Sequence, residues 1–220
     1  MQNRRKLRYL AVVGMLSALA YCAMLLGKLI PNVAGFLSFD PKDAVVVIAG
    51  FIYGPVTSLI ISVFVSLIEM VTVSTTGLYG LLMNVVSTCA FALPAVGIYR
   101  WKRTKAGAVA GLAAGVCVMA GTMVLWNYII TPLYMGIPRE QVAGMLATVF
   151  LPFNAVKGVI NAALVMIVYK PLVTALRKAK LVDDPNGEDG KRRISVWTIV
   201  IASAVLITAV LLLLVLAGVL

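Results

Sequence analysis

The run AVVVIAGFIYGPVTSLIISVFVSLIEMVTV, residues 44–73, decides how many helices this chain forms. A membrane-spanning helix needs roughly 20 apolar residues, so the run is too long for one comfortable crossing and short for two. Gly54 and Pro55 stand inside it, and a proline interrupts a helix because it lacks the backbone N–H and clashes with the preceding turn. The run is therefore either one long helix or two helices that meet at Gly54-Pro55.

The positions of the basic residues favour two helices. Lysine and arginine gather in three clusters, within residues 4–8, 100–105 and 177–193. Loops rich in Lys and Arg stay in the cytoplasm, so an even number of crossings must separate successive clusters. A break at Gly54-Pro55 gives four crossings before the second cluster, whereas one long helix gives three. We therefore expect six core helices, with both ends of this core in the cytoplasm.

The expected helices are apolar segments bounded by charged, Gly-containing or Pro-containing stretches. They cover residues 9–27, 44–53, 55–73, 81–99, 106–130, 147–170 and 196–220. The sequence thus predicts an all-α integral membrane protein with a six-helix domain at residues 1–176. A charged cytoplasmic linker is expected at 177–195, followed by a seventh transmembrane helix at 196–220.

Composition supports this class and excludes several functions. The chain is 62% apolar and 12% charged, whereas soluble domains are about half apolar and a quarter charged. The net charge of +11 lies in the topological clusters, so we predict no nucleic-acid partner. Histidine is absent and no CxxC or GxxxxGK[ST] motif occurs, which removes the usual metal, nucleophile and ATPase motifs. We expect a subunit that is not an enzyme and holds no cofactor or metal.

A polar stripe marks the sixth expected helix. In LPFNAVKGVINAALVMIVY, residues 151–169, the side chains of Asn154, Lys157 and Asn161 fall on one narrow face of a helix. Lys157 lies roughly 15 Å below the outer end. A lysine at such depth costs about 2.5–3.5 kcal/mol unless it has a partner or a water-filled cavity.

Other amides lie at the same level. Asn127 and Asn84 lie near the outer ends of the fifth and fourth expected helices. Together with the sixth expected helix, these helices are predicted to form the wall of a pocket that opens outward. Asparagines also hydrogen-bond neighbouring helices, a modest interaction of about 0.5–2 kcal/mol. For Asn127, Asn154 and Lys157 we favour ligand contact, because amides alone do not neutralise a lysine. For Asn84 and Asn161 the two roles are equally favoured.

Two outer loops extend the predicted site. The loop at residues 27–43 contains Phe36, Leu37 and Phe39, and is either a hairpin on the membrane surface or a lid over a flat ligand. The loop at residues 74–80 contains two glycines, where backbone can approach a ligand closely. The predicted ligand-binding set is Leu37, Phe39, Thr76, Gly77, Asn84, Asn127, Asn154 and Lys157.

Glu69 and a row of small residues in the first helix can each be interpreted in structural or in functional terms. Glu69 is the only carboxylate inside an expected span, and its place near the outer end favours a structural or interfacial contact over a proton relay. Gly14, Ala18 and Cys22 recur every four residues in the first helix. Small residues at this spacing allow close approach of another helix, either within the core or from a partner.

Four motifs together resemble one family. The order FDPKDAVVVIAGFIYGP, STTGLYGLLMN, WNYIITPLY and LPFNAVKGVINA is similar to the riboflavin-binding S component of energy-coupling factor (ECF) transporters. The resemblance covers about residues 5–175, and the NY and PFNxxKG elements are its most specific part. The seventh helix departs from the family pattern, which ends after six helices.

The resemblance implies a subunit in the plasma membrane of a prokaryote, with a cytoplasmic N-terminus, that captures riboflavin from outside. It implies as partners a transmembrane coupling protein (T protein) and two cytoplasmic ABC-type ATPases, which drive release inside. It also implies flavin contacts for Asn127, Asn154 and Lys157, and contact of Gly14 and Ala18 with the coupling protein.

Three alternatives remain open on the sequence. One is an S component for another flat vitamin, such as thiamine. Another is a stand-alone carrier driven by ions, for which Glu69 is the only candidate acid within a span. The third is a structural or signalling membrane protein that binds no small molecule.

Overall fold

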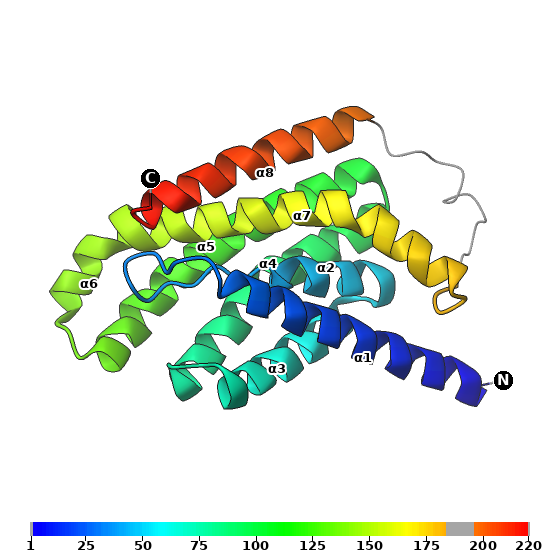
Figure 1. Cartoon of the computed structure of the whole chain (residues 1–220), viewed down its shortest axis with the longest axis horizontal. Helices are drawn as coiled ribbons and strands as arrows, with labels where there is room; N and C mark the ends of the chain where they lie inside the picture. Colours follow the sequence, from blue (N-terminus) through cyan, green and yellow to red (C-terminus); the bar gives the residue numbers. More distant parts are fainter. Residues whose placement is uncertain (1, 184–195, 220) are drawn as a thin grey trace.

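The computed structural model describes residues 2–183 and 196–219 as a bundle of helices (Figure 1). In chain order these are α1 (Gln2–Gly27), α2 (Lys42–Tyr53), α3 (Pro55–Thr72), α4 (Gly77–Lys102), α5 (Lys105–Met135), α6 (Arg139–Met145), the π-helical turn η1 (Leu146–Phe150), α7 (Leu151–Lys178) and α8 (Val196–Leu216). The expected core of six helices corresponds to α1 to α5 and α7, and α8 is the expected seventh.

The break at Gly54-Pro55 separates α2 from α3, as the charge pattern predicts. Gly54 has a backbone φ of 110°, which residues other than glycine rarely adopt. Pro55 occupies the first position of α3. A Cβ atom on Gly54 would also collide with the guanidinium of Arg100. Local chemistry thus turns the chain back after only 12 residues of α2.

The start of α2 corrects the expected boundary. We expected the helix to begin at Ala44, but it begins at Lys42, so Lys42 and Asp43 belong to its buried first turn. Buried ion pairs explain the difference. Lys42 pairs with Asp40 and Glu69, and Asp43 pairs with Lys157, so these charges are satisfied inside the bundle.

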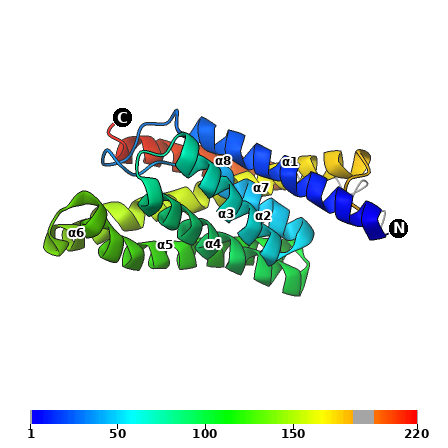
Figure 2. The same ribbon diagram turned by 90° about the horizontal axis from the view of Figure 1, so that it is seen from below.

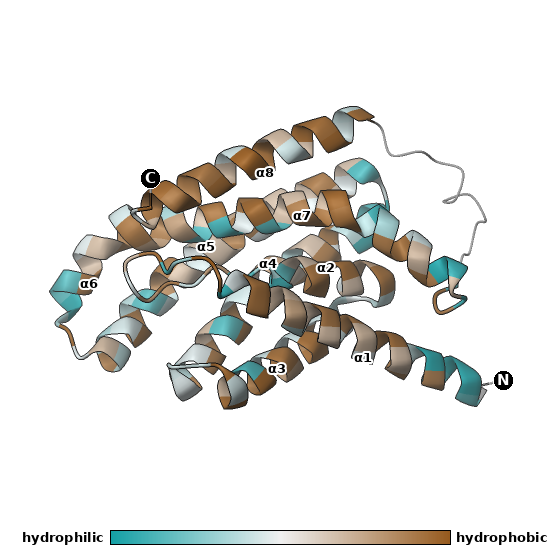
Figure 3. Ribbon diagram, viewed as in Figure 1, coloured by the Kyte–Doolittle hydropathy of each residue, from teal (hydrophilic) through white to brown (hydrophobic). Residues whose placement is uncertain are grey.

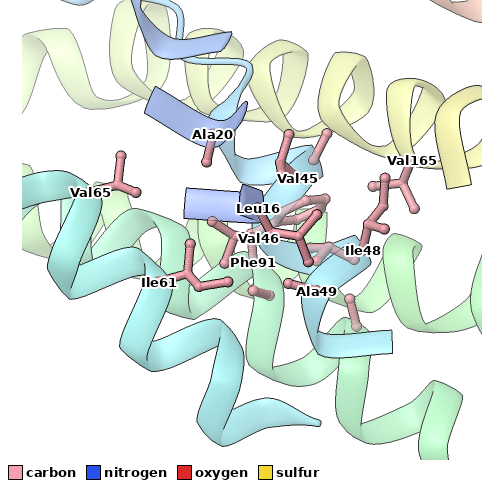
Figure 4. Packing of buried hydrophobic residues seen from close by; sticks show 14 of the residues in the cluster. Leu16, Ala20, Val45, Val46, Ile48, Ala49, Ile61, Val65, Phe91 and Val165 are labelled. Atoms are coloured by element: carbon pink, nitrogen blue, oxygen red, sulfur yellow. The ribbon is translucent and has the colours of Figure 1, made fainter. Parts of the chain in front are cut away.

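Helix α2 forms the centre of the main hydrophobic core. It contacts α1, α3, α4 and α7, and its residues Val46 and Ile48 are fully buried. Figure 4 shows these side chains packed with Leu16 of α1 and Phe91 of α4. Figure 2 shows α2, α3 and α4 lying between α1 and α5. The longer helices therefore pack around the short, buried helix α2.

The described residues of the three basic clusters lie at one end of the bundle. The N-terminal end of α1, the connection between α4 and α5, and the C-terminal end of α7 are all at the right-hand end in Figure 1. Figure 3 shows hydrophilic residues at this end of α1 and α7 and long hydrophobic stretches along the helices. We call this the basic end. Six helical segments in the described part of the chain are long and apolar enough to cross a membrane.

The entry to the sixth core helix differs from the expectation. We expected it to start at Ala147, but α6 and the π-helical turn η1 precede α7 and join it in one apolar segment, Arg139–Lys178. Pro152 stands in the first turn of α7, where a proline fits because that turn has no intrahelical N–H bond to lose. The wide turn at η1 directly precedes the residues of the polar stripe.

Helix α8 packs along α7, and its residues Ala209 and Leu213 are buried. They belong to a second hydrophobic cluster that includes Leu37, Phe39 and Phe153. The seventh helix therefore contacts the core. It ends at Leu216 rather than at the expected Leu220, and the expected linker lies partly in α7 and partly, at residues 184–195, outside the described residues.

Candidate functional site

A cavity of about 280 Å³ lies at the end of the bundle opposite the basic end. Its walls come from the loop at residues 28–41, the C-terminal end of α3, the loop at residues 73–76, and helices α4, α5 and α7. Chain segments far apart in the sequence converge on this cavity, as expected of a ligand site, and we call it the outer cavity.

Asn154 and Lys157 both line the outer cavity, as predicted. The amide nitrogen of Asn154 donates a hydrogen bond of 2.8 Å to the carbonyl of Phe150, one turn earlier. Within the described part of the chain, its side-chain oxygen accepts no hydrogen bond, so it remains available as an acceptor for a ligand. Asn154 is 2% exposed and Lys157 is 5% exposed, so both are nearly removed from solvent.

The structure supplies a partner for Lys157 that the sequence analysis missed. The Lys157 ammonium lies 3.4 Å from the Asp43 carboxylate and donates a hydrogen bond of 3.3 Å to the hydroxyl of Ser87. Thr88 donates a hydrogen bond of 2.6 Å to the other oxygen of Asp43. The expectation that Asp43 belongs to the outer loop is therefore wrong. Asp43 lies inside the bundle because α2 begins two residues early.

Asn127 lies behind the wall of the outer cavity. It is fully buried, and its amide nitrogen donates to the carbonyl of Met123 at 2.7 Å. Its side-chain oxygen accepts a hydrogen bond of 3.0 Å from the hydroxyl of Thr131. Met123 and Thr131 line the cavity, whereas Asn127 does not. In this structure Asn127 holds the residues that form the wall.

The loop at residues 28–41 contributes to the cavity through part of its predicted lid. Phe36 and Leu37 line it, but Phe39 is buried in the cluster beside α8 and does not. Phe36 packs against Phe150 of η1 with ring centroids 5.9 Å apart. Phe153 also lines the cavity, one residue before Asn154. Its place in the PFN motif, next to Asn154, is a signal in the sequence that could have identified it.

Only part of the loop predicted at residues 74–80 lines the outer cavity. Thr76 lines the outer cavity, whereas Gly77 does not, because it begins α4 with φ 54°. Gly80, one turn into α4, lines the cavity instead. Asn84 lines it as predicted and donates a hydrogen bond of 2.9 Å to Glu69.

Glu69 joins the cavity wall to the outer loop through ion pairs. One carboxylate oxygen lies 2.9 Å from the ammonium of Lys28, and the other lies 2.8 Å from that of Lys42. Lys42 also pairs with Asp40. Glu69 is 2% exposed, so it makes the structural contact that we favoured over a relay. We call Lys28, Asp40, Lys42 and Glu69 the charge clamp.

Electrostatics keep Asp40 charged within this clamp. Burial would raise the pKa of its carboxyl group, but the nearby ammonium groups of Lys42 and Lys157 outweigh burial and hold the pKa below its usual range.

Asn161 holds the chain segment at Asp40 and Ala44 by hydrogen bonds. It accepts a hydrogen bond of 3.0 Å from the backbone N–H of Ala44 and donates one of 3.1 Å to the carbonyl of Asp40. Asn161 therefore makes an interhelical contact, one of the two roles that the sequence left equally favoured for it.

The chain is similar to known proteins along most of its length. Residues 8–169 match the family described as the substrate-specific component of ECF transporters. Riboflavin transporter RibU of Staphylococcus aureus (strain TCH60) is 28% identical over 189 residues, covering 81% of this chain and 100% of the relative. Riboflavin transporter FmnP of Bacillus subtilis (strain 168) is 28% identical over 188 residues, covering 80% and 99%.

A solved structure agrees with these sequence matches. It is described as the S component of a bacterial ECF transporter, and it aligns with a TM-score of 0.66 at 26% sequence identity, covering 80% of this chain and 99% of that chain. The family match covers residues 8–169. The multi-helix membrane fold and the polar cavity between the helices agree with this match. The chain therefore belongs to the family of substrate-specific components (S components) of ECF transporters.

Proposed function

We propose that this chain captures riboflavin from outside the cell and delivers it to an ECF transporter for uptake. The observation that carries the proposal is the pairing of Asn154 and Lys157 on one wall of the outer cavity. Relatives named as riboflavin transporters match over 99% to 100% of their own length, which supports the same substrate.

The chemistry of the cavity suits a flavin. The isoalloxazine ring of riboflavin is flat and aromatic, and Phe36, Tyr79 and Phe153 provide aromatic walls. One edge of the ring alternates carbonyl acceptors with an N–H donor. The oxygen of Asn154 can accept from the N–H, and Lys157 can donate to a carbonyl or ring nitrogen. An analogue without these groups would leave buried polar atoms unpaired, which disfavours its binding.

Topology supports capture from outside. The basic clusters belong in the cytoplasm under the positive-inside rule, and the outer cavity lies at the opposite end of the bundle. We therefore propose a cytoplasmic N-terminus and an outward-facing loop at residues 28–41. We propose the plasma membrane as the location, with the cavity facing the medium.

The first helix has a face suited to the coupling protein. Gly14 and Ala18 are exposed on α1, and a Cβ atom added to Gly14 meets no atom within 4 Å. A helix of another protein could therefore approach this face closely. We propose that it contacts the transmembrane coupling protein, while two cytoplasmic ABC-type ATPases supply the energy.

Titration of riboflavin fluorescence with the detergent-purified chain tests the substrate. We expect saturable quenching by riboflavin and no competition from thiamine. Competition by thiamine at similar concentration, or no quenching, would refute the riboflavin assignment. Uptake into liposomes that contain this chain alone would instead support the ion-driven carrier.

A further inference from the structure

Helix α8 comes close to the outer cavity, although none of its described residues lines it. It packs along α7, and Figures 1 and 2 both show its C-terminal end beside the loop at residues 28–41. A row of buried and half-buried residues faces the bundle at spacings of four and three: Ala202, Leu206, Ala209, Leu213 and Leu216. Residues at this spacing share one helix face, so α8 lies against the bundle along most of its length.

The second hydrophobic cluster joins the C-terminal part of α8 to this loop. Ala209 and Leu213 belong to the cluster, and Leu213 is only 1% exposed. The cluster also contains three buried residues of the loop: Val33, Leu37 and Phe39. Its remaining buried members come from α6, η1 and α7: Val142, Phe150, Phe153, Val156 and Ile160. Parts of the chain that are distant in sequence are therefore packed together at this end of the bundle.

Part of this cluster forms the wall of the outer cavity. Leu37 and Phe153 are buried in the cluster and also line the cavity. Phe36 packs against the cluster and lines the cavity as well. Apolar side chains that would contact a flat ligand therefore belong to the same packed unit as Leu213. Because protein interiors are close-packed, a void left at Leu213 would disturb the other members of the cluster.

The loop contains a tight hairpin that depends on its surroundings. The backbones of Val33 and Leu37 exchange two hydrogen bonds, of 2.9 and 3.0 Å. Between them Ala34 has a φ of 52°, a left-handed conformation that costs energy for a residue with a side chain and persists only where the surrounding structure holds it. Val33 is 4% exposed and does not line the cavity, whereas Leu37 does. Packing around Val33 therefore fixes the position of Leu37 through the two backbone bonds.

We propose that α8 holds the ligand site in its binding conformation, with Leu213 as a positioning residue. Leu213 keeps the second hydrophobic cluster packed around the hairpin, so that Phe36 and Leu37 stay at the cavity. A loop that is ordered before binding loses less conformational entropy on binding, and such gains in affinity are mostly expressed as slower ligand release. With riboflavin as the ligand, this role rests on the proposed function. Helix α8 begins at Val196, so this support lies outside the part of the chain that matches the family, residues 8–169.

Hydrogen exchange of the detergent-purified full chain, followed by mass spectrometry, tests the connection in the wild type. Riboflavin should slow exchange at residues 206–216 of α8 as well as at residues 28–41, because coupled segments stabilise each other reciprocally. Residues 197–204 of the same helix are the internal control, since none of them belongs to the second hydrophobic cluster. Unchanged exchange at residues 206–216 in the presence of bound riboflavin would overturn the proposal.

Leu213→Ala removes the proposed support. The matched control is Leu112→Ala, the same substitution at a residue of α5 that is 2% exposed, belongs to the main hydrophobic core and does not line the outer cavity. Both variants should lose stability, because each leaves a void. Only Leu213→Ala should speed exchange at residues 28–41 in the ligand-free chain and raise the riboflavin dissociation rate, measured by stopped-flow fluorescence, by about fivefold. Leu213→Met nearly conserves volume and should restore both.

Two outcomes of the variant experiment would contradict the role of α8. Unchanged exchange at residues 28–41 in Leu213→Ala would mean that the loop is independent of α8. The same increase in Leu112→Ala would mean that the loop reports only global stability. Circular dichroism and gel filtration establish that each variant is folded, and if Leu213→Ala is not, the wild-type exchange and Leu213→Met decide. Exchange in the ligand-free chain needs no riboflavin, so failure of riboflavin to bind would refute the proposed substrate while the loop still tests α8.

Discussion

Lys157 and Asp43 form the ion pair on which the outer cavity depends. Both are nearly buried, and Lys157 also reaches Ser87 on the cavity wall. Breaking a buried pair by removing one partner typically costs about 3–5 kcal/mol, because the other charge stays buried without compensation. The lysine is therefore held in place by the protein and still lines the cavity for a ligand.

This pairing separates stability from binding in a double-variant experiment. Lys157→Met should weaken riboflavin binding and also lower the free energy of unfolding by about 3–5 kcal/mol. Adding Asp43→Asn should recover most of the stability but none of the binding. Thermal unfolding and fluorescence titration measure the two effects. Recovery of binding in the double variant would mean that Lys157 does not contact the ligand.

Asn154 and Asn127 differ in the structure, although the resemblance implies flavin contact for both. Asn154 lines the outer cavity, while Asn127 supports Met123 and Thr131 behind it. Asn154→Ala should weaken riboflavin binding by about 1–3 kcal/mol, the cost of an unpaired buried polar group. Asn127→Ala should weaken it less. Equal losses in fluorescence titrations would show that the bound ligand reaches Asn127.

Among the elements, the loop at residues 28–41 is held by charges at both ends. Lys28 and Asp40 of this loop join Glu69 of α3 through the charge clamp. The loop also supplies Phe36 and Leu37 to the outer cavity. The clamp therefore positions one wall of the ligand site, and Glu69 both lines the cavity and holds the loop.

Glu69→Gln should release this loop. The substitution removes the negative charge between Lys28 and Lys42 and leaves the Lys42 ammonium paired with Asp40 alone. We expect faster hydrogen exchange at residues 28–41 and weaker riboflavin binding, with the helices intact. Glu140→Gln on α6 is the matched control, because Glu140 does not line the cavity. Unchanged exchange in the loop would contradict the proposed role of the clamp.

Helix α8 packs against α7 without lining the outer cavity itself. None of its described residues lines the outer cavity, yet Leu213 is buried and Leu211 on the opposite face is 50% exposed. Leu213→Ala should lower the free energy of unfolding by about 2–5 kcal/mol, whereas Leu211→Ala should leave it unchanged. Thermal unfolding measures this pair. Equal effects would mean that α8 does not pack on the core in the membrane.

At the scale of the whole molecule, the chain presents separate surfaces for ligand and partner. The outer cavity lies at one end, and the small residues of α1 lie along an exposed side. Gly14→Leu should therefore reduce riboflavin uptake by the complete ECF transporter at least several-fold while leaving riboflavin binding to the isolated chain unchanged. Met15→Leu, at an exposed neighbouring position, is the control. Loss of binding in Gly14→Leu would show that this face packs within the chain.

The sequence by itself determined the number and order of the core helices. The break at Gly54-Pro55 depends on backbone conformation and a missing N–H, and the spans depend on local apolar length, so neighbouring residues suffice to predict them. The need for a polar site at Lys157 was likewise readable, because a charged side chain in a membrane helix is costly wherever it occurs.

Tertiary packing decided which residues meet. Asp43 reaches Lys157 only because α2 is enclosed by α1, α3, α4 and α7, and no local pattern encodes that arrangement. Asn127 lies on the same face of α5 as Met123 and Thr131, four residues from each, but its amide is bonded to the Met123 carbonyl and the Thr131 hydroxyl, and those two residues line the cavity instead. The sequence predicts which chemical groups the site contains. Their partners and facing depend on how distant helices pack.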